Sequence, residues 1–415
     1  MLDHIQKTAD APLGEVMSTS GPRVLVLAWD GLHDKSALSG MPFGMRLGLE
    51  KAGCDVTLGE IGPFNLVSGF HNVRKSLAGS RVLRRGRKLQ QYCVERLASG
   101  RVKRRLEAHA RASARIADEI VRRTCPDVVF GPCMSRPIGF METSKPIVYA
   151  SDATATLLVE TYDVYRRRGR IWKAAMNDFE DKAIARADRV VLASRSSARS
   201  AIEDHRGEPA KVSVVPLGAN VSAGLQDGIM VPADPPGSDS LDLLLVAADP
   251  ERKQLGLCVN IAAELRLRGW NATLHYVGPH RSECESEVVE WAGRLQLGNQ
   301  EDAARHRSLL RKCHVSLLPS LAEMYGISPI ESAAFARPAV VSDVGGLPTV
   351  VLDGLTGRVL PVRTPCRGWV DAIEEMISRE DRYASFSSEA FNRYRSVLNW
   401  PAWGASVRKL MEELV

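Results

Sequence analysis

Short runs of apolar, mostly β-branched residues alternate along the chain with longer segments of helical composition. Runs that are apolar at consecutive positions are typical of strands buried on both faces of a parallel sheet. The first series of predicted strands is RVLVLA (23–28), DVVF (127–130), PIVYA (146–150), RVVLAS (189–194) and KVSVVP (211–216). The second series is LDLLLVA (241–247), TLHYVG (273–278), HVSLLP (314–319) and AVVSD (339–343). This alternation predicts an α/β fold with parallel sheets.

The segment GLQDGIMVPADPPGSDS (224–240), rich in Gly, Pro, Asp and Ser, separates the two series and indicates a linker. A chain of 415 residues is also too long for one ordinary domain. We therefore expect two α/β domains, 22–222 and 241–392, preceded by a flexible extension at 1–21 and joined through 223–240. A ligand is expected in the cleft between them, at the C-terminal ends of their strands.

Composition narrows the class of protein. Hydrophobic residues make up 45% and charged residues 25%, as in ordinary soluble globular proteins. No apolar run reaches the roughly 18 residues that a membrane span needs. The first residues lack a basic start followed by an apolar core, so we expect a cytoplasmic protein. The eight cysteines form no C-x-x-C pair, so neither a zinc site nor a disulfide framework is predicted.

Positive charge is concentrated between residues 74 and 123. This block has sixteen Lys or Arg against four acids, a local charge of +12, whereas the whole chain carries +6. Two interpretations stay open: a solvated helical face, or a surface attracted to anionic lipid headgroups or to an acidic acceptor. The second would place the protein peripherally at the inner face of the membrane. No nucleic-acid partner is expected, because aromatic residues are only 6% and no nucleic-acid-binding motif accompanies the block.

The stretch SLAEMYGISPIESAAFARP (320–338) carries two acids, Glu323 and Glu331, with seven residues between them. It follows a predicted strand, so a turn containing Gly326 should lead into a helix that begins at the cleft. The backbone N–H groups of Ile327 and Ser328 would then face the ligand and favour a phosphate. Two acids beside such a helix start suit a molecule with hydroxyls on either side of a diphosphate, such as a nucleotide sugar. The alternative for Glu331 is a capping box with Ser328.

This stretch resembles the E-x7-E motif of the retaining glycosyltransferases of family 4, which have the GT-B fold of two Rossmann-like domains facing a central cleft. Other segments resemble the family in the same order. They are SGMPFGMRLGLEKAG (39–53), YASDATATLL (149–158), VVPLGANV (214–221), DPERKQLG (249–256), DVGGLPTVVLDGLTG (343–357) and RSVLNWPAWG (395–404). The resemblance covers most of residues 22–412. It implies an acceptor-side domain at 22–222, a donor domain at 241–392 and a C-terminal helix, within 393–415, that returns to the first domain.

The resemblance also implies roles for single residues. Glu323 would contact the transferred sugar and Glu331 the ribose hydroxyls, while Arg252 and Lys253 would neutralise the donor diphosphate. Fixed cations lower the cost of the negative charge that the leaving diphosphate gains. No metal or other cofactor is then required, and the nucleotide-diphosphate sugar is a co-substrate.

Four further positions match the family but have simpler explanations. Asp152 would lie near the reacting face of the sugar, or would only cap the helix after Ala153. Gly40 would let the backbone approach the ligand, or would serve turn geometry alone. Gly345 and Gly346 would line the site, or would only form a turn between a strand and a helix.

The implied function is the transfer of a sugar to an acceptor hydroxyl with retention at the anomeric carbon. The acceptor would be a glycan, a lipid-linked molecule or a small molecule. Two alternatives remain: a GT-B epimerase or hydrolase that acts on a nucleotide sugar, and a non-catalytic nucleotide-sugar-binding protein. The chain departs from the family where Thr349 replaces a common acid and where Ala247 and Ala248 replace a common arginine. These departures leave the donor open.

Overall fold

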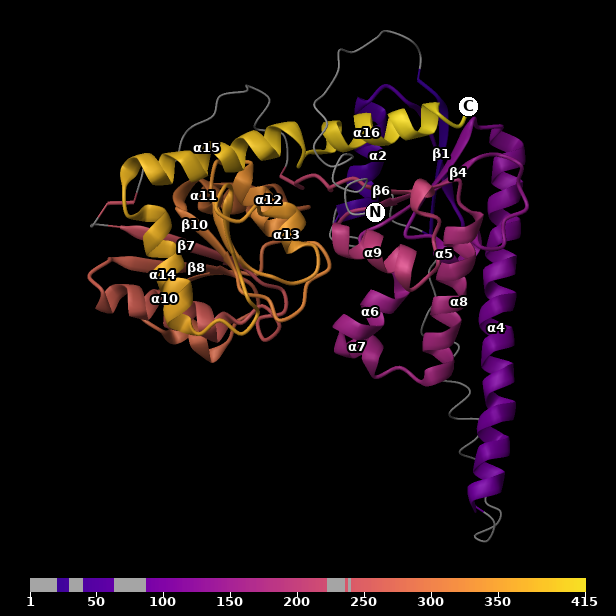
Figure 1. Cartoon of the computed structure of the whole chain (residues 1–415), viewed down its shortest axis with the longest axis horizontal. Helices are drawn as coiled ribbons and strands as arrows, with labels where there is room; N and C mark the ends of the chain where they lie inside the picture. The colour runs from indigo at the N-terminus through magenta and orange to yellow at the C-terminus, as the bar shows by residue number, and fades with distance from the viewer. Residues whose placement is uncertain (1–20, 30–39, 63–86, 222–235, 238–239) are drawn as a thin grey trace.

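The computed structural model describes residues 21–29, 40–62, 87–221, 236–237 and 240–415, and for 87–101 it describes the backbone alone. The described residues form two α/β units, each built on a parallel six-stranded sheet (Figure 1). We call residues 21–221 the N-domain and residues 240–396 the C-domain. The predicted fold class is confirmed.

The N-domain sheet has the strand order β2-β1-β3-β4-β5-β6, and the C-domain sheet has the order β12-β11-β10-β7-β8-β9. The N-domain strands are β1 (Arg23–Ala28), β2 (Asp55–Glu60), β3 (Val128–Pro132), β4 (Ile147–Ser151), β5 (Arg189–Leu192) and β6 (Val212–Val214). The C-domain strands are β7 (Leu241–Val246), β8 (Ala272–Val277), β9 (Val289–Gly293), β10 (Val315–Leu318), β11 (Ala339–Ser342) and β12 (Gly357–Leu360).

Three strands of the described chain, β2, β9 and β12, have no counterpart among the predicted runs. All three lie at a sheet edge. Their side chains are largely half-buried or exposed, in contrast to the central strands β3 and β4, which are buried throughout. An edge strand needs no continuous apolar run, so the pattern that reveals a central strand is missing there.

Helices cover both faces of each sheet. In the N-domain they are α2 (Met41–Lys51), α4 (Arg87–Thr124), α5 (Ser135–Ile138), α6 (Ala155–Thr161), α7 (Asp163–Arg166), α8 (Arg170–Arg186) and α9 (Arg195–Glu203). In the C-domain they are α10 (Leu255–Leu267), α11 (Gln300–Lys312), α12 (Ile327–Ala333), α13 (Leu347–Val350), α14 (Cys366–Ile377) and α15 (Glu380–Ser396). The last helix is α16 (Trp400–Glu412). Short 3₁₀ turns lie at Pro209–Lys211 and Ser282–Glu285.

The alternation of side chains along a strand divides each core into two layers. Leu243 and Leu245 of β7 pack in the same cluster as Ile261 of α10, whereas Leu244 packs in a cluster with Leu310 of α11. Successive side chains of a strand point to opposite faces of the sheet, so an uninterrupted apolar run buries both faces. This is why runs such as LDLLLVA fold as central strands.

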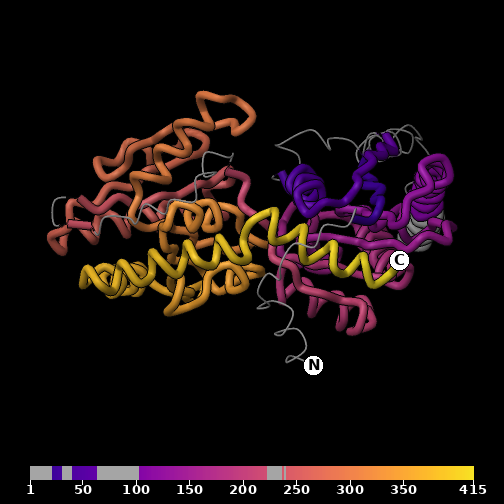
Figure 2. The backbone as a smooth tube through the Cα atoms, turned by 90° about the horizontal axis from the view of Figure 1, so that it is seen from above, coloured from indigo at the N-terminus to yellow at the C-terminus, as the bar shows by residue number. Residues whose placement is uncertain are grey.

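The chain returns to the N-domain at its C-terminal end. Figure 2 shows α15 and α16 running one after the other across the two domains, with α15 on the C-domain and α16 on the N-domain. Helix α16 packs directly on α2 through glycines: a Cβ added at Gly404 would lie 1.9 Å from the carbonyl oxygen of Gly48, and one at Gly44 would lie 2.1 Å from the Trp400 ring. The returning helix that the resemblance implies is therefore present.

The strand order fixes where a ligand can sit. In the C-domain, β7 and β10 are parallel neighbours at which the strand order reverses, and in open parallel sheets such a point is where a crevice for a ligand is expected, outside the carboxyl ends of the strands. The loop after β7 contains Arg252 and Lys253, and the loop after β10 contains Glu323. The fold thus brings together at one sheet edge residues that are about 70 positions apart in the sequence.

Candidate active site

The two loops at the C-domain crevice are joined to each other. The backbone N–H of Leu321 donates to the carbonyl oxygen of Arg252 at 2.9 Å, and the side-chain amide of Gln254 donates to the carbonyl oxygen of Pro319. Gln254 has φ +54°, and the Asp249 carboxylate accepts the backbone N–H of Arg252 at 3.1 Å. These contacts set the direction in which the side chains of Arg252 and Lys253 leave the loop.

Two cations share the Glu323 carboxylate. Arg252 Nη1 lies 3.1 Å and Lys253 Nζ 3.8 Å from Glu323 Oε2, and Ser320 Oγ donates to the same oxygen at 3.5 Å. Glu323 is only 8% exposed. Burial lowers the pKa of the Lys253 ammonium, and the negative charge of Glu323 partly offsets this decrease. The structure therefore places three of the predicted site residues in direct contact. We call this group the Arg252–Glu323–Lys253 cluster.

The glycine pair Gly345-Gly346 supports the loop that carries Glu323. A Cβ added at Gly345 would lie 1.7 Å from the carbonyl oxygen of Glu323, and one at Gly346 would lie 2.6 Å from that of Met324. Gly345 also has φ +57°, in the left-handed region that favours glycine. The pair thus does more than form a turn, because only residues without a side chain allow the two loops this approach.

Helix α12 starts earlier than a capping box at Ser328 would require. The N-cap residue is Gly326, with φ +95°, and Ile327 and Ser328 already belong to the helix. The capping alternative for Glu331 is therefore wrong. Instead, Glu331 Oε2 lies 3.2 Å from Nε2 of His306 on α11, and both side chains are buried. Contact of Ile327, Ser328 or Glu331 with a ligand stays a prediction.

Asp152 follows β4 of the N-domain and does not cap a helix. The N-cap of α6 is Thr154, whose hydroxyl accepts the backbone N–H of Leu157 at 3.3 Å, so the capping alternative for Asp152 is also wrong. Burial raises the pKa of Asp152 to about 6, and the negative charge of Glu323 contributes to that shift. The carboxyl of Asp152 therefore lies within electrostatic reach of the Arg252–Glu323–Lys253 cluster, although it comes from the other domain.

Tyr162 adds an aromatic ring to the cluster from the N-domain. The Arg252 guanidinium carbon lies 5.4 Å from the centre of the Tyr162 ring, a cation–π distance. Burial, with the charge of Glu323, raises the pKa of the Tyr162 hydroxyl above its ordinary value. No sequence pattern indicated this residue, because the contact joins positions 90 residues apart on different domains.

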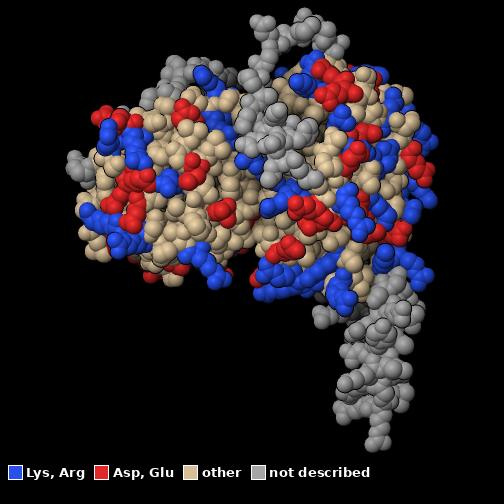
Figure 3. All heavy atoms as spheres, viewed as in Figure 1, with Lys and Arg blue, Asp and Glu red and all other residues tan. Residues whose placement is uncertain are grey.

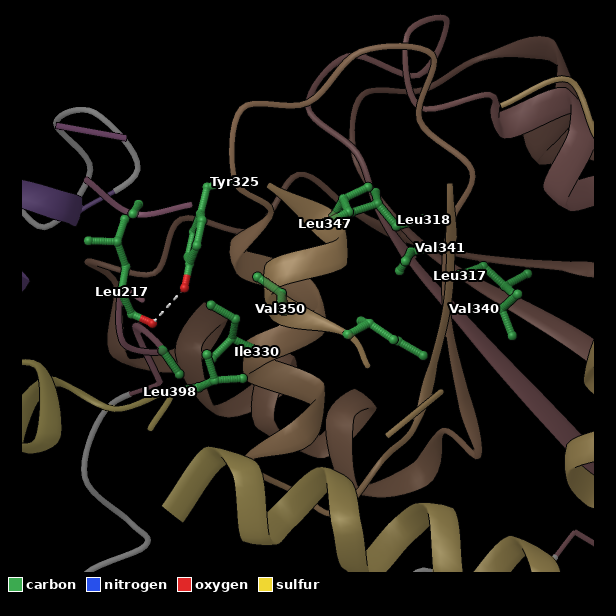
Figure 4. Close-up of a cluster of buried hydrophobic side chains, with 14 of the residues drawn as sticks. Leu217, Leu317, Leu318, Tyr325, Ile330, Val340, Val341, Leu347, Val350 and Leu398 are labelled. Atoms are coloured by element: carbon green, nitrogen blue, oxygen red, sulfur yellow. Dashed lines mark hydrogen bonds between the residues drawn. The ribbon is translucent and has the colours of Figure 1, made fainter. Parts of the chain in front are cut away.

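Hydrogen bonds hold the two domains together beside the cluster. Tyr325 Oη donates to the carbonyl oxygen of Leu217 at 3.2 Å, as Figure 4 shows next to the buried side chains of α12, α13 and the C-domain strands. The backbone N–H of Arg195 donates to Thr349 Oγ1 at 3.2 Å. Thr349, which departs from the resembled family, thus bonds across the domain boundary.

The position of Gly40 is explained without a ligand. Gly40 is buried at the N-cap of α2 with φ +77°, which explains the glycine by backbone geometry, and residues 30–39 before it lie outside the described part. Within the described residues, no group of three or more His, Cys, Asp or Glu side chains is arranged to hold a metal ion. Metal independence stays a prediction.

Comparison with solved structures places the chain in the GT-B fold. Sucrose-phosphate synthase from Thermosynechococcus elongatus superposes over 95% of this chain and 99% of its own, with a TM-score of 0.62 at 15% identity. The Anabaena protein HepE in complex with UDP superposes over 94% of this chain and 100% of its own, with a TM-score of 0.60 at 12% identity. At such identities the likeness concerns the fold alone.

Residues 241–379, which make up most of the C-domain, match the family described as glycosyl transferases group 1. Two curated relatives are named D-inositol 3-phosphate glycosyltransferase. The one from Nocardia farcinica is 27% identical over 49% of this chain and 48% of its own, and the one from Kineococcus radiotolerans is 29% identical over 56% and 58%. The chain thus spans about half the length of the curated relatives it matches.

Replacing Asp152 by Asn tests the position of its carboxyl. Because the pKa of Asp152 is raised to about 6, its charge opposes folding above that pH, and this penalty disappears as pH falls below the ordinary value of 3.8. The Asp152→Asn variant should therefore unfold at a higher temperature than wild type at pH 8, by on the order of a few degrees, and lose this advantage near pH 4. Differential scanning calorimetry across this range measures it. A difference that does not vary with pH would contradict the desolvation of the Asp152 carboxyl.

Proposed function

We propose that the protein is a retaining glycosyltransferase that moves a sugar from a nucleoside-diphosphate sugar to an acceptor hydroxyl without a metal ion. The observation that carries the proposal is the Arg252–Glu323–Lys253 cluster at the crevice of the C-domain. An arginine and a lysine that share one carboxylate form a fixed pair of cations in a largely buried place. Such a pair suits a diphosphate, whose oxygens can take over the contacts of the carboxylate.

We infer the orientation of the donor from the positions of Glu323 and Glu331. Glu323, next to the cations, would accept hydrogen bonds from the sugar, and Glu331, farther along α12, would accept them from the ribose hydroxyls. His306 Nε2 contacts Oε2 of Glu331, so Oε1 is the oxygen that we assign to the ribose. In this arrangement the diphosphate lies between the two acids. Retention at the anomeric carbon rests on the resemblance to family 4.

The proposed reaction occurs on one face of the sugar. The bond from the anomeric carbon to the donor phosphate oxygen breaks, and a bond to the acceptor oxygen forms on the same face. The acceptor proton passes to the departing phosphate oxygen. Arg252 and Lys253 stabilise the charge that develops on the diphosphate, which is where a fixed charge lowers the barrier most. A covalent intermediate on Asp152 is the less favoured alternative, because burial and Glu323 both disfavour its charged, nucleophilic form.

The acceptor is proposed to bind on the N-domain side, near Asp152 and Tyr162. It is a hydroxyl of a glycan, of a lipid-linked molecule or of a small molecule. The name of the curated relatives, D-inositol 3-phosphate glycosyltransferase, adds a phosphorylated polyol to these candidates. We propose a location in the cytoplasm. In the described part of the chain no helix is long and apolar enough to cross a bilayer.

Binding of the basic block, 74–123, to an anionic membrane stays a proposal. Residues 74–86 lie outside the described part, and so do the side chains of 87–101. In the remainder of α4, Arg111 pairs with Glu107, and Arg122 and Arg123 pair with Glu119. These i, i+3 and i, i+4 pairs on an exposed helix support the solvated-face interpretation for this stretch.

Product analysis tests the proposed reaction. The protein is incubated with a panel of nucleotide sugars, with and without an acceptor mixture, and products are identified by mass spectrometry. A glycosyltransferase forms a glycosylated acceptor and nucleoside diphosphate. The Lys253→Ala variant should lose at least about a hundredfold of that activity, whereas Lys51→Ala, at the exposed end of α2, should not. An altered or free sugar without any acceptor adduct would indicate the epimerase or hydrolase, and binding without turnover would indicate the non-catalytic protein.

Two replacements of Glu331 distinguish its proposed contact with the ribose from its contact with His306. Glu331→Ala removes the proposed ribose acceptor and leaves buried His306 without its partner, so nucleoside-diphosphate affinity should fall by about tenfold or more, with a lower melting temperature. Glu331→Gln keeps an acceptor for His306 and should lose less stability. Calorimetric titration with UDP, ADP and GDP measures the affinity. A lower melting temperature with unchanged affinity for whichever nucleotide binds would remove the ribose assignment.

A further inference from the structure

The N-domain carries a second basic surface around α7 and the start of α8, separate from the block at 74–123. Residues 160–173 contain five bases against two acids, a net charge of +3. The bases are Arg166, Arg167, Arg168, Arg170 and Lys173, and we call this group the α7 surface. Figure 3 shows Lys and Arg side chains gathered along the lower edge of the N-domain, where Figure 1 places α7 and the segment that leads to α8.

The local structure exposes the four arginines of this surface to solvent, whereas Lys173 is half-buried. The Tyr165 ring stacks on Trp172, with centroids 5.9 Å apart and planes 6° apart, and Trp172 itself is buried. This stack anchors α7 to the start of α8, so the four arginines between the two rings lie on an exposed turn. Arg167 is 82% exposed. Val164 is 60% exposed on the same short helix, which adds an apolar side chain to the basic surface.

Two acids accompany the arginines without neutralising them. Asp163 lies 3.1 Å from Arg166 and 3.6 Å from Arg167, whereas Glu160 accepts from Arg166 through its backbone carbonyl oxygen and not through its carboxylate. Exposed ion pairs of this kind are weak and are screened by salt, so an anionic surface can compete with Asp163 for both arginines. The net positive charge remains in either case.

The surface adjoins the entrance of the candidate active site. Tyr162 is the residue that immediately precedes α7, and its ring lies on Arg252 of the C-domain. Figure 3 shows the lower part of the molecule notched between the two domains, with the α7 surface on the N-domain side of the notch. A partner bound to the α7 surface would therefore lie beside the place where we expect the acceptor.

We propose that the α7 surface binds an anionic phospholipid bilayer and holds the entrance of the active site against it. Clustered bases attract the anionic leaflet, and an exposed apolar residue among them can enter the headgroup region. Binding to the bilayer does not depend on the proposed transferase activity, whereas the placement of the active-site entrance rests on the proposed function. It differs from the proposal for residues 74–123, because it rests on side chains whose positions are described.

Co-sedimentation of the full chain with vesicles tests the proposal. The vesicles contain equal parts of phosphatidylglycerol and phosphatidylcholine, and vesicles of phosphatidylcholine alone serve as the neutral control. Wild type should bind the anionic vesicles at low salt and be released at high salt. Replacing Arg166, Arg167, Arg168 and Arg170 by Ser should weaken binding at least about tenfold. Nucleotide affinity without lipid should stay unchanged, which separates this result from a defect in the active site.

Two further variants sharpen the test. A charge-matched control replaces Arg363, Arg367, Arg379 and Arg382, which are exposed around α14 and α15 of the C-domain, by Ser and should retain most of the binding. Asp163→Asn releases Arg166 and Arg167 from their acid and should strengthen binding, a gain that misfolding cannot produce.

Three outcomes would overturn the proposal. The first is that wild type stays in the supernatant with anionic vesicles at low salt. The second is that the two fourfold variants lose binding equally, since net charge alone would then explain it. The third is that inorganic phosphate raises the melting temperature of wild type but not of the α7 variant, without any vesicle binding, which would assign the arginines to a soluble phosphate ligand.

Discussion

The organisation of this molecule depends on one carboxylate. Glu323 lies almost out of solvent, and a charged acid in such a place must be paired. Arg252 and Lys253 provide the pairing from a loop that follows a different strand, so the ion contacts tie the two loops of the crevice to each other. The Gly345-Gly346 pair lies so close to the same loop that no side chain would fit there. The strand order, the two glycines and the ion pairs thus all act on the loop that carries Glu323.

The N-domain adds residues to the Arg252–Glu323–Lys253 cluster. Asp152 and Tyr162 come from the N-domain. The charge of Glu323 contributes to the raised pKa of each of these two side chains. They are held there by contacts outside the cluster: the bond from Tyr325 to the backbone of Leu217, the bond from Arg195 to Thr349, and the packing of α16 on α2. A transferase that forms a bond between a donor on one domain and an acceptor on the other requires such a shared site. The arrangement of the two domains is therefore part of the proposed chemistry.

Sequence patterns predicted the parts of this structure that obey short-range rules. Central strands were recognisable because both of their faces are buried. The joint role of Arg252, Lys253 and Glu323 was implied by the resemblance to family 4, and the rule that parallel strands end at one edge explains why these residues meet. The edge strands β2, β9 and β12 were missed because a half-exposed strand has no continuous apolar run.

The errors within the site have similar physical causes. Ser328 looked like a helix cap, but Gly326 adopts a left-handed conformation that lets the helix begin earlier. The partners of Glu331 and Arg252, which are His306 and Tyr162, depend on how whole helices and domains pack. No local pattern contains that information.

The central claim is that Arg252 and Lys253 bind the diphosphate of a nucleotide donor. The most direct measurement is the ratio of affinities for nucleoside diphosphate and nucleoside monophosphate, obtained by calorimetry for wild type and for the Arg252→Ala, Lys253→Ala double variant. We expect wild type to prefer the diphosphate strongly, and the double variant to lose most of that preference while it still binds the nucleoside part. If the double variant stays folded and keeps the wild-type ratio, the cations do not contact the second phosphate and the assignment of the site is wrong.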